Sequence, residues 1–189
     1  MARPATAAPA AAPEPAAAAK PRTLLELLAA GGRWRLQRDG QQTPFLDGST
    51  QLAHARDTGL KALATWCSHS LGDAAVEMLE TSAFAAATRG LTSLPYARLT
   101  WLAHLVGSDG QLEAGLDAGA RYKLARWPQV ERDFPKHFRI ATAMMKAAGT
   151  VEEIAEASGA PLAEVANFIN AYHSSGHIEV DGAAGRRSH

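Results

Sequence analysis

Start and stop signals for helices follow one another at short intervals in the last third of the chain, and they limit the fold more than any other feature. Pro135 can open a helix that Gly149 closes, since proline suits a first helical position and glycine suits the position after the last. Thr150 and Glu153 have the spacing of a capping box, in which each side chain bonds the backbone N–H of the other. Gly159 then closes a second helix. The spacing predicts two short helices, with a tight turn after the second.

A third helix and a strand are expected to follow. Pro161 can start the helix and Gly176 can end it, and residues 177–180 then alternate between polar and apolar, which predicts a short strand. At about 100° per residue, the apolar side chains of this helix fall on one side. These are Leu162, Val165, Phe168, Ile169 and Tyr172.

The letters TVEEIAEASGAPLAEVANFINAYHSSGHIEV give the order helix, glycine turn, helix, glycine and strand, which resembles the winged helix-turn-helix superfamily. The resemblance covers roughly a quarter of the chain and bears on fold more than on function. It implies a winged-helix-like module over residues 121–182, with the third helix in the position that meets the major groove of DNA. The returning strand of the wing would have to come from Ala183 to His189, which is a poor strand sequence.

The outward side of the third helix lacks the charge of a DNA reader. The helix has no Lys or Arg, although neutralisation of phosphates supplies most of the non-specific affinity for DNA. Asn167 and Asn170 could pair with adenine edges, but Glu164 lies in the first turn, where a phosphate would approach. We therefore expect this face to dock a protein. The alternative is a DNA-binding transcriptional regulator with cations from elsewhere: Arg33, Arg35, Arg121, Lys123, Arg126 or a dimer partner.

The first part of the module is basic and the rest is acidic. Residues 121–127 alternate, which predicts a strand, and basic side chains recur from there to Lys146 with only Glu131 and Asp133 against them. Further on, the acidic residues face no basic residue before Arg186. Such a charge dipole indicates either internal pairing or a docked partner of opposite sign. The expected partner-binding residues are Arg121, Lys123, Arg126, Arg139, Glu164, Asn167 and Asn170.

A short helix and a β-hairpin are predicted near the start of the chain. Residues 23–26 resemble a capping box, and the glycines at 31–32 end the helix that it opens. Residues 33–38 alternate with period two, which predicts a strand. Residues 39–40 mark a turn, so residues 43–47 can return as the second strand.

The second strand of this hairpin is expected at a sheet edge. Pro44 cannot donate a hydrogen bond to a ladder, so a central position would leave a bond unmade. Trp34, Leu36 and Phe45 are expected on the inner face of the hairpin. The arginines of the hairpin then lie on a solvated outer face.

The middle of the chain has apolar spacing that is compatible with helices. Residues 51–70, 73–90 and 95–107 predict three of them, each near a capping residue, proline or glycine. Large aromatic side chains dominate core burial. The aromatic residues expected in the core are Trp66, Phe84 and Trp101.

The two ends of the chain are expected to be flexible. The first 22 residues are almost entirely Ala and Pro, and their prolines interrupt any helix. The predicted organisation is a disordered tail (1–22), a mostly helical region with an N-terminal β-hairpin (23–120), a winged-helix-like module (121–182) and a flexible tail (183–189). The fold class is mainly α with small β elements (α+β).

Bulk properties and missing motifs narrow the function. The 19 basic and 19 acidic side chains balance, so the chain has no field that would draw it to nucleic acid or anionic lipid. The single Cys67 rules out an intramolecular disulfide and a Cys-rich metal site. The sequence has no Gly-rich phosphate loop or His-Glu metal helix, and no apolar run near the roughly 18 residues of a membrane span. We expect a cytosolic, bacterial-type regulatory or adaptor protein that is not an enzyme, holds no cofactor or metal, and docks a protein partner.

Overall fold

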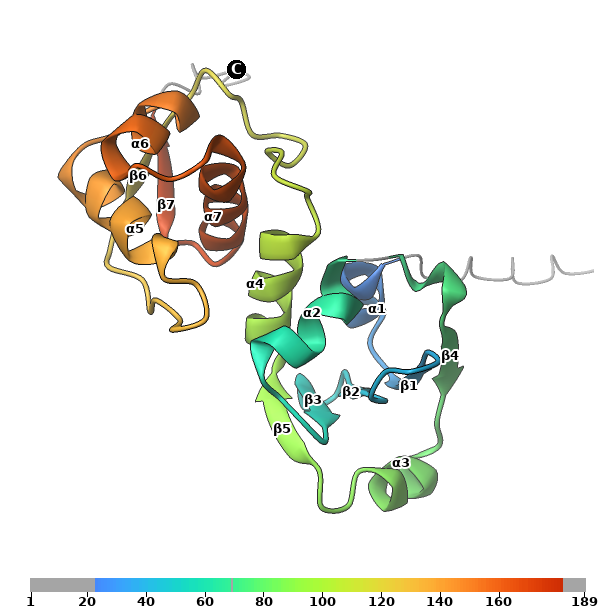
Figure 1. Cartoon of the computed structure of the whole chain (residues 1–189). Coiled ribbons are helices and arrows are strands. Elements are labelled where there is room, and N and C mark those ends of the chain that lie inside the picture. Colours follow the sequence, from blue (N-terminus) through green and yellow to red (C-terminus); the bar gives the residue numbers. More distant parts are fainter. Residues whose placement is uncertain (1–22, 69, 182–189) are drawn as a thin grey trace, which may run out of the picture.

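The computed structural model describes residues 23–68 and 70–181 and has an α+β fold with antiparallel sheets (Figure 1). The tails predicted at 1–22 and 183–189 lie outside the described residues. The N-terminal unit comprises α1 (Leu24–Ala30), β1 (Arg33–Gln37), β2 (Phe45–Asp47), β3 (Leu52–Ala55), α2 (Leu60–Ser68), a 3-10 turn (Leu71–Asp73), β4 (Ala75–Met78), α3 (Thr81–Ala87), β5 (Thr92–Pro95) and α4 (Tyr96–Val106). The C-terminal unit comprises β6 (Arg121–Leu124), α5 (Lys136–Lys146), α6 (Val151–Ser158), α7 (Leu162–Ser174) and β7 (Ile178–Asp181).

The predicted helix and hairpin near the start of the chain are confirmed, with two corrections. The Thr23 hydroxyl caps α1, and β1 pairs with β2 in antiparallel register. The second strand is not at an edge, because β2 lies between β1 and β3, and Pro44 precedes the strand and only accepts a hydrogen bond, from Leu36 N–H. Phe45 is opposite Arg35, so it lies on the other face from Trp34.

The expectation of a mostly helical middle is wrong in part, because three of its segments are strands. The sheet has the order β4-β1-β2-β3-β5, and every neighbouring pair is antiparallel. β3 occupies the start of the helix predicted for residues 51–70, and β4 occupies the start of the one predicted for 73–90. β4 pairs with the distant β1, and β3 pairs with the neighbouring β2 and the distant β5. Such pairing overrides helix-compatible local spacing.

Helices cover both faces of the sheet. Figure 1 shows α1, α2 and α4 on one side, and Leu36, Leu46 and Leu94 of the sheet belong to the same buried cluster as these helices. On the other side, Phe84 of α3 packs edge-on against Phe45, with 6.1 Å between ring centroids. Trp66, Phe84 and Trp101 are all buried, as the sequence predicts.

The helix α4 belongs to both units. It packs against α2 in the N-terminal unit and against α7 in the C-terminal unit. Its Trp101 meets Phe134 and Tyr172 edge-on, with centroid distances of 5.8 and 5.6 Å. Buried hydrophobic residues of both units therefore form one cluster that extends from Leu24 to Ile178, while Phe45 and Phe84 lie outside it on the other face of the sheet.

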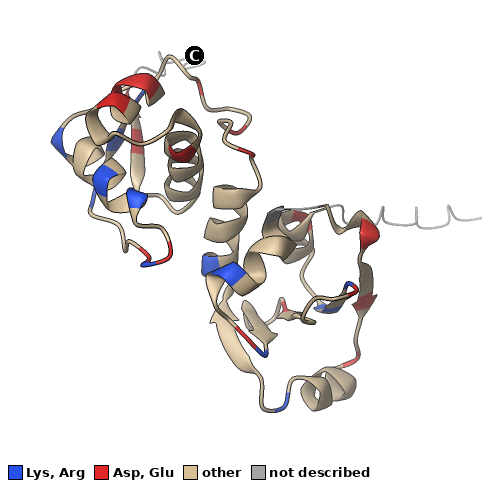
Figure 2. Ribbon diagram, viewed as in Figure 1, with Lys and Arg blue, Asp and Glu red and all other residues tan. Residues whose placement is uncertain are grey.

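The predicted succession of helices and a strand in the C-terminal unit is confirmed. Thr150 and Glu153 form both bonds of the capping box at the start of α6, and Gly159 ends this helix in the left-handed conformation. β7 pairs with β6, an upstream strand, and Tyr122 also bridges Gly149. Figure 2 shows basic residues along β6 and α5 and acidic residues on α6. Among the described residues, no helix has the length and apolar character needed to cross a bilayer.

The capping box gives a test of this fold. Thr150→Ala removes the hydroxyl that accepts the Glu153 N–H, and we expect it to lower the free energy of unfolding by about 1 kcal/mol. Thr142→Ala is the matched control, because the Thr142 hydroxyl bonds only the carbonyl of Phe138 inside α5. It is expected to change stability by less than about 0.5 kcal/mol. Urea titration measures both, and equal losses would contradict the assigned cap.

Candidate docking surface

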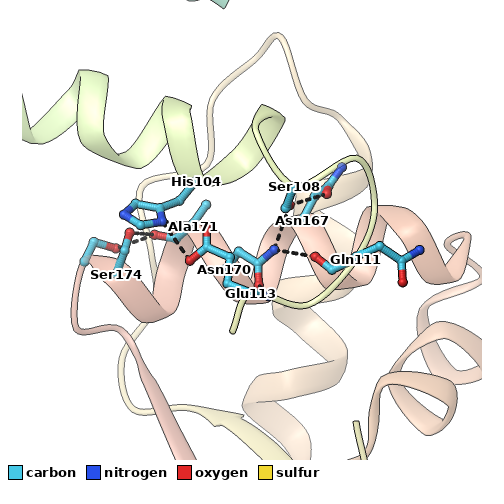
Figure 3. Close-up of polar contacts among 9 residues, drawn as sticks. His104, Ser108, Gln111, Glu113, Asn167, Asn170, Ala171 and Ser174 are labelled. Carbon is cyan, nitrogen blue, oxygen red and sulfur yellow. Dashed lines mark hydrogen bonds and ion pairs between the residues drawn. The ribbon is translucent and has the colours of Figure 1, made fainter. Parts of the chain in front are cut away.

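The middle of the α7 face that the sequence places outward is covered by a loop from elsewhere in the chain. The side chain of Asn170 is fully buried. Its Nδ2 donates to Ser108 Oγ at 2.8 Å and to the carbonyl of Gln111 at 2.7 Å, and its Oδ1 accepts the N–H of Glu113 at 3.0 Å (Figure 3). Every hydrogen-bonding direction used by this amide therefore points to residues 108–113, which we call the clamp loop.

Asn167 contacts the same loop. Its Oδ1 accepts the N–H of Gly110 at 2.9 Å and the hydroxyl of Ser108 at 3.2 Å. A Cβ at Gly110 would lie 2.5 Å from the Cβ of Ala163, and φ at this glycine is +80°. Glycine is thus required for the clamp loop to come this close to α7. The expectation that Asn170 faces a partner is wrong, because a loop distant in sequence takes up its polar atoms, and the same loop holds Oδ1 of the partly buried Asn167.

The clamp loop is also tied to α4. Nδ1 of His104 lies 2.7 and 2.8 Å from the two carboxylate oxygens of Glu113 (Figure 3). The loop therefore bridges α4 and α7, the two helices that join the units. Within the described part of the chain, no group of three or more His, Cys, Asp or Glu residues is arranged to hold a metal ion.

Two of the predicted partner-binding charges are used in internal ion pairs. Arg121 pairs with Glu153 at 2.9 Å, and Glu164 pairs with Lys136 at 2.9 Å. The pKa of Glu153 is lowered mainly by a hydrogen bond from the Thr150 N–H, and to a smaller extent by one from Arg121.

The arginines of the N-terminal hairpin are paired as well. Arg33 contacts Asp47, and Arg35 contacts Glu77. These two cations belong to the five-stranded sheet and already have carboxylate partners there. They therefore do not supply α7 with the positive charge that the DNA-binding alternative requires.

The basic stretch 121–146 keeps a surplus of positive charge. Its two acidic residues both pair with the N-terminal unit, Glu131 with Arg98 at 2.8 Å and Asp133 with Lys61 at 3.5 Å. They do not neutralise their basic neighbours. Of the seven basic residues in the stretch, two are paired as described above. The five without an ion pair among the described residues are Lys123, Arg126, Arg132, Arg139 and Lys146.

An apolar group lies among these cations. Trp127 and Phe138 are 47% and 58% exposed, and their rings meet edge to face with 5.6 Å between centroids. Met145 is 37% exposed and follows Phe138 by two helical turns, so both lie on the same side of α5. We call Trp127, Phe138 and Met145 the α5 face.

Sequence reasoning missed this surface because it placed the docking residues on the third helix and among the charges, and gave no role to the apolar residues of the helix that follows Pro135. The buried side chains of α5 are His137, Ile140, Ala141 and Met144. Phe138 and Met145 lie about 100° from the centre of that stripe at the rotation of an α-helix. Their angular offset was the signal that could have separated them from the core residues.

His137 occupies the junction between the units. It is 1% exposed, stacks on Phe134 at 5.0 Å, and meets Phe168 edge-on at 5.1 Å, while its Nδ1 has no hydrogen-bond partner. Burial lowers its pKa to about 4, and the nearby carboxylate of Glu164 opposes this shift.

The buried amide of α7 gives a test of the clamp. Asn170→Ala leaves the N–H of Glu113 and the carbonyl of Gln111 without their partner, and we expect it to lower the free energy of unfolding by about 2 kcal/mol. Hydrogen exchange at Glu113 N–H is expected to accelerate. Asn167→Ala is the control, with a smaller loss because its side chain is only partly buried. Wild-type stability and exchange in Asn170→Ala would contradict the clamp.

The pKa of His137 predicts a pH dependence of stability. The pKa is about 4 in the folded protein and 6.5 for an ordinary histidine, so the unfolded chain binds the proton more tightly. Well above pH 6.5, titration of His137 does not affect the free energy of unfolding. As the pH drops from 6.5 towards 4, this free energy falls by up to about 3 kcal/mol. In His137→Phe this part of the loss is expected to vanish. Urea unfolding at pH 7 and pH 4.5 measures it, and identical losses in both proteins would contradict the assignment.

Comparison with known proteins identifies no relative of this chain. No family model, curated protein or solved structure matches the chain. The function is therefore argued from the contacts and charges described above.

Proposed function

We propose that the protein is a non-enzymatic regulatory or adaptor protein whose C-terminal unit is a winged-helix-like module that docks another protein through the α5 face. The order of α5, α6, α7 and β7, with a capping box and a left-handed glycine between helices, supports the winged-helix assignment. The observation that carries the docking function is the contrast between Asn170 in the middle of α7, which is buried against the clamp loop, and the α5 face, which is exposed.

The covered state of α7 argues against the usual DNA-reading geometry. In DNA-binding helix-turn-helix proteins the second helix of the motif enters the major groove and contacts base edges. Here that helix is α7, and freeing its outward side would break the three hydrogen bonds of Asn170 to the clamp loop. Buried polar groups that lose their partners are costly, so the closed arrangement is favoured.

The composition of the α5 face supports a protein partner. Aromatic residues, methionine and arginine are enriched in protein interfaces, and this face combines Trp127, Phe138 and Met145 with neighbouring arginines. Grouped apolar side chains on a surface mark interaction sites more often than scattered ones do.

The sole cysteine supports a non-enzymatic role. Burial raises the pKa of Cys67 to about 12, so the thiol stays protonated at neutral pH. The thiolate is the reactive form, and a buried thiol without it behaves as a small apolar side chain. The His104–Glu113 pair holds the clamp loop against α4, so this His-carboxylate pair has a structural role.

Substitutions on the α5 face test the proposed function. Proteins that cross-link near Phe138 in the native host are purified and their binding to the intact chain is measured. Phe138→Ala and Met145→Ala are each expected to weaken binding of the partner protein at least tenfold, which is about 1.4 kcal/mol. The melting temperature is expected to stay unchanged, because both side chains are exposed.

Met78→Ala is the matched control, since Met78 is 64% exposed on β4 of the other unit. It is expected to leave binding unchanged. Two results would overturn the proposal. One is a partner that binds Phe138→Ala as tightly as the wild type, and the other is nanomolar affinity for duplex DNA that falls steeply as salt rises.

A further inference from the structure

We infer that the partner presents an acidic amphipathic helix to the α5 face, an inference that rests on the docking function proposed above. Three independent features of the face carry it: the sign of its charge, the placement of that charge beside each apolar side chain, and the spacing of the apolar side chains along α5.

The charge on this side of the protein is uncompensated. Glu131 and Asp133, the only acidic residues of the stretch 121–146, are held by Arg98 and Lys61 of the other unit. Arg126, Arg139 and Lys146 make no ion pair with any carboxylate of the described residues. A partner of opposite sign would satisfy them, and complementary charge sets orientation and speeds association.

Each apolar side chain of the face has an unpaired cation next to it in sequence. Arg126 precedes Trp127, and Arg139 follows Phe138. Lys146 follows Met145 in the same way. All three cations are exposed and make no ion pair within the described residues. Neighbours on a helix point about 100° apart, so on α5 the cations Arg139 and Lys146 form a row beside the row of Phe138 and Met145. Arg139 Nη1 lies towards the end of α6, 3.6 Å from the Cβ position of Gly159. These rows match a ligand helix that carries carboxylates along one side of its apolar face.

The spacing fits a helical ligand. Phe138 and Met145 are seven residues apart on α5, which is about 10 Å along the axis at 1.5 Å per residue. An amphipathic helix repeats its apolar anchors at the same interval, because positions i and i+7 lie on one face. Acidic residues beside those anchors would meet Arg139 and Lys146.

A single-stranded nucleic acid fits the surface less well. Proteins that bind single strands stack successive bases on aromatic rings. In the α5 face the rings of Trp127 and Phe138 are already engaged edge to face with each other, and the third apolar side chain is a methionine. The chain as a whole has no net charge, so no long-range field draws in a polyanion.

Selection from a displayed library of helical peptides tests the inference on the intact chain. The enriched peptides are expected to be acidic and to carry two apolar residues seven positions apart. Fluorescence anisotropy with the best peptide is expected to show at least tenfold weaker binding to the double variant Arg126→Glu/Arg139→Glu, and weaker binding to the wild type as salt rises. Arg56→Glu/Arg89→Glu is the matched control, because both arginines are exposed in the N-terminal unit. This variant is expected to bind like the wild type.

The outcomes separate the two proposals. Enriched peptides that are neutral or basic, yet lose affinity on Phe138→Ala, would overturn the acidic helix and keep docking at the α5 face. Peptides that bind Phe138→Ala as tightly as the wild type, or a failure to enrich any peptide, would overturn both. An oligo-dT strand that binds more tightly than every selected peptide would assign the face to nucleic acid. If the double charge variant unfolds at a lower temperature than the wild type, the salt dependence of the wild type replaces it as the test. Peptide binding that does not weaken as salt rises would overturn the acidic helix.

Discussion

The burial of Asn170 between α4, α7 and the clamp loop is the constraint on which the rest of the arrangement depends. An amide can leave water only when its donors and acceptor are satisfied, and here the hydroxyl of Ser108 and two backbone groups of the clamp loop do this. The bonds fix α7 against α4, and with it the C-terminal unit against the N-terminal unit. Trp127 and the exposed residues of α5 lie outside this contact and stay accessible.

Electrostatics act on top of this packing. The sequence shows a basic stretch followed by an acidic one and leaves internal pairing and an external partner as alternatives. Internal pairing accounts for part of the charge: Arg121 and Lys136 pair with the acidic half, whereas the carboxylates closest to the cations in sequence pair with the other unit. Surface pairs of this kind stabilise by at most about 1 kcal/mol each, so their main effect is to determine where charge stays exposed.

Local signals in the sequence are enough to predict the caps and boundaries of the C-terminal helices and the first hairpin. Capping by Thr150 or a left-handed Gly159 depends on a few neighbouring residues only. The remaining strands of the large sheet and the clamp loop depend on contacts between residues distant in the chain, such as Glu113 with Asn170. Coverage of a helix by a loop from elsewhere in the chain leaves no local signal in the sequence, so the sequence places Asn170 on a docking face although the structure buries it.

The double role of α4 has a consequence for how the chain denatures. One face of α4 packs towards the sheet and another packs against α7, and both faces belong to one continuous cluster of buried side chains. Pulling the units apart would bare apolar surface on both, including the ring of Trp101. Neither unit then retains a complete interior, so heat or urea should melt the whole protein in one cooperative step, with no half-folded species that keeps only the C-terminal unit.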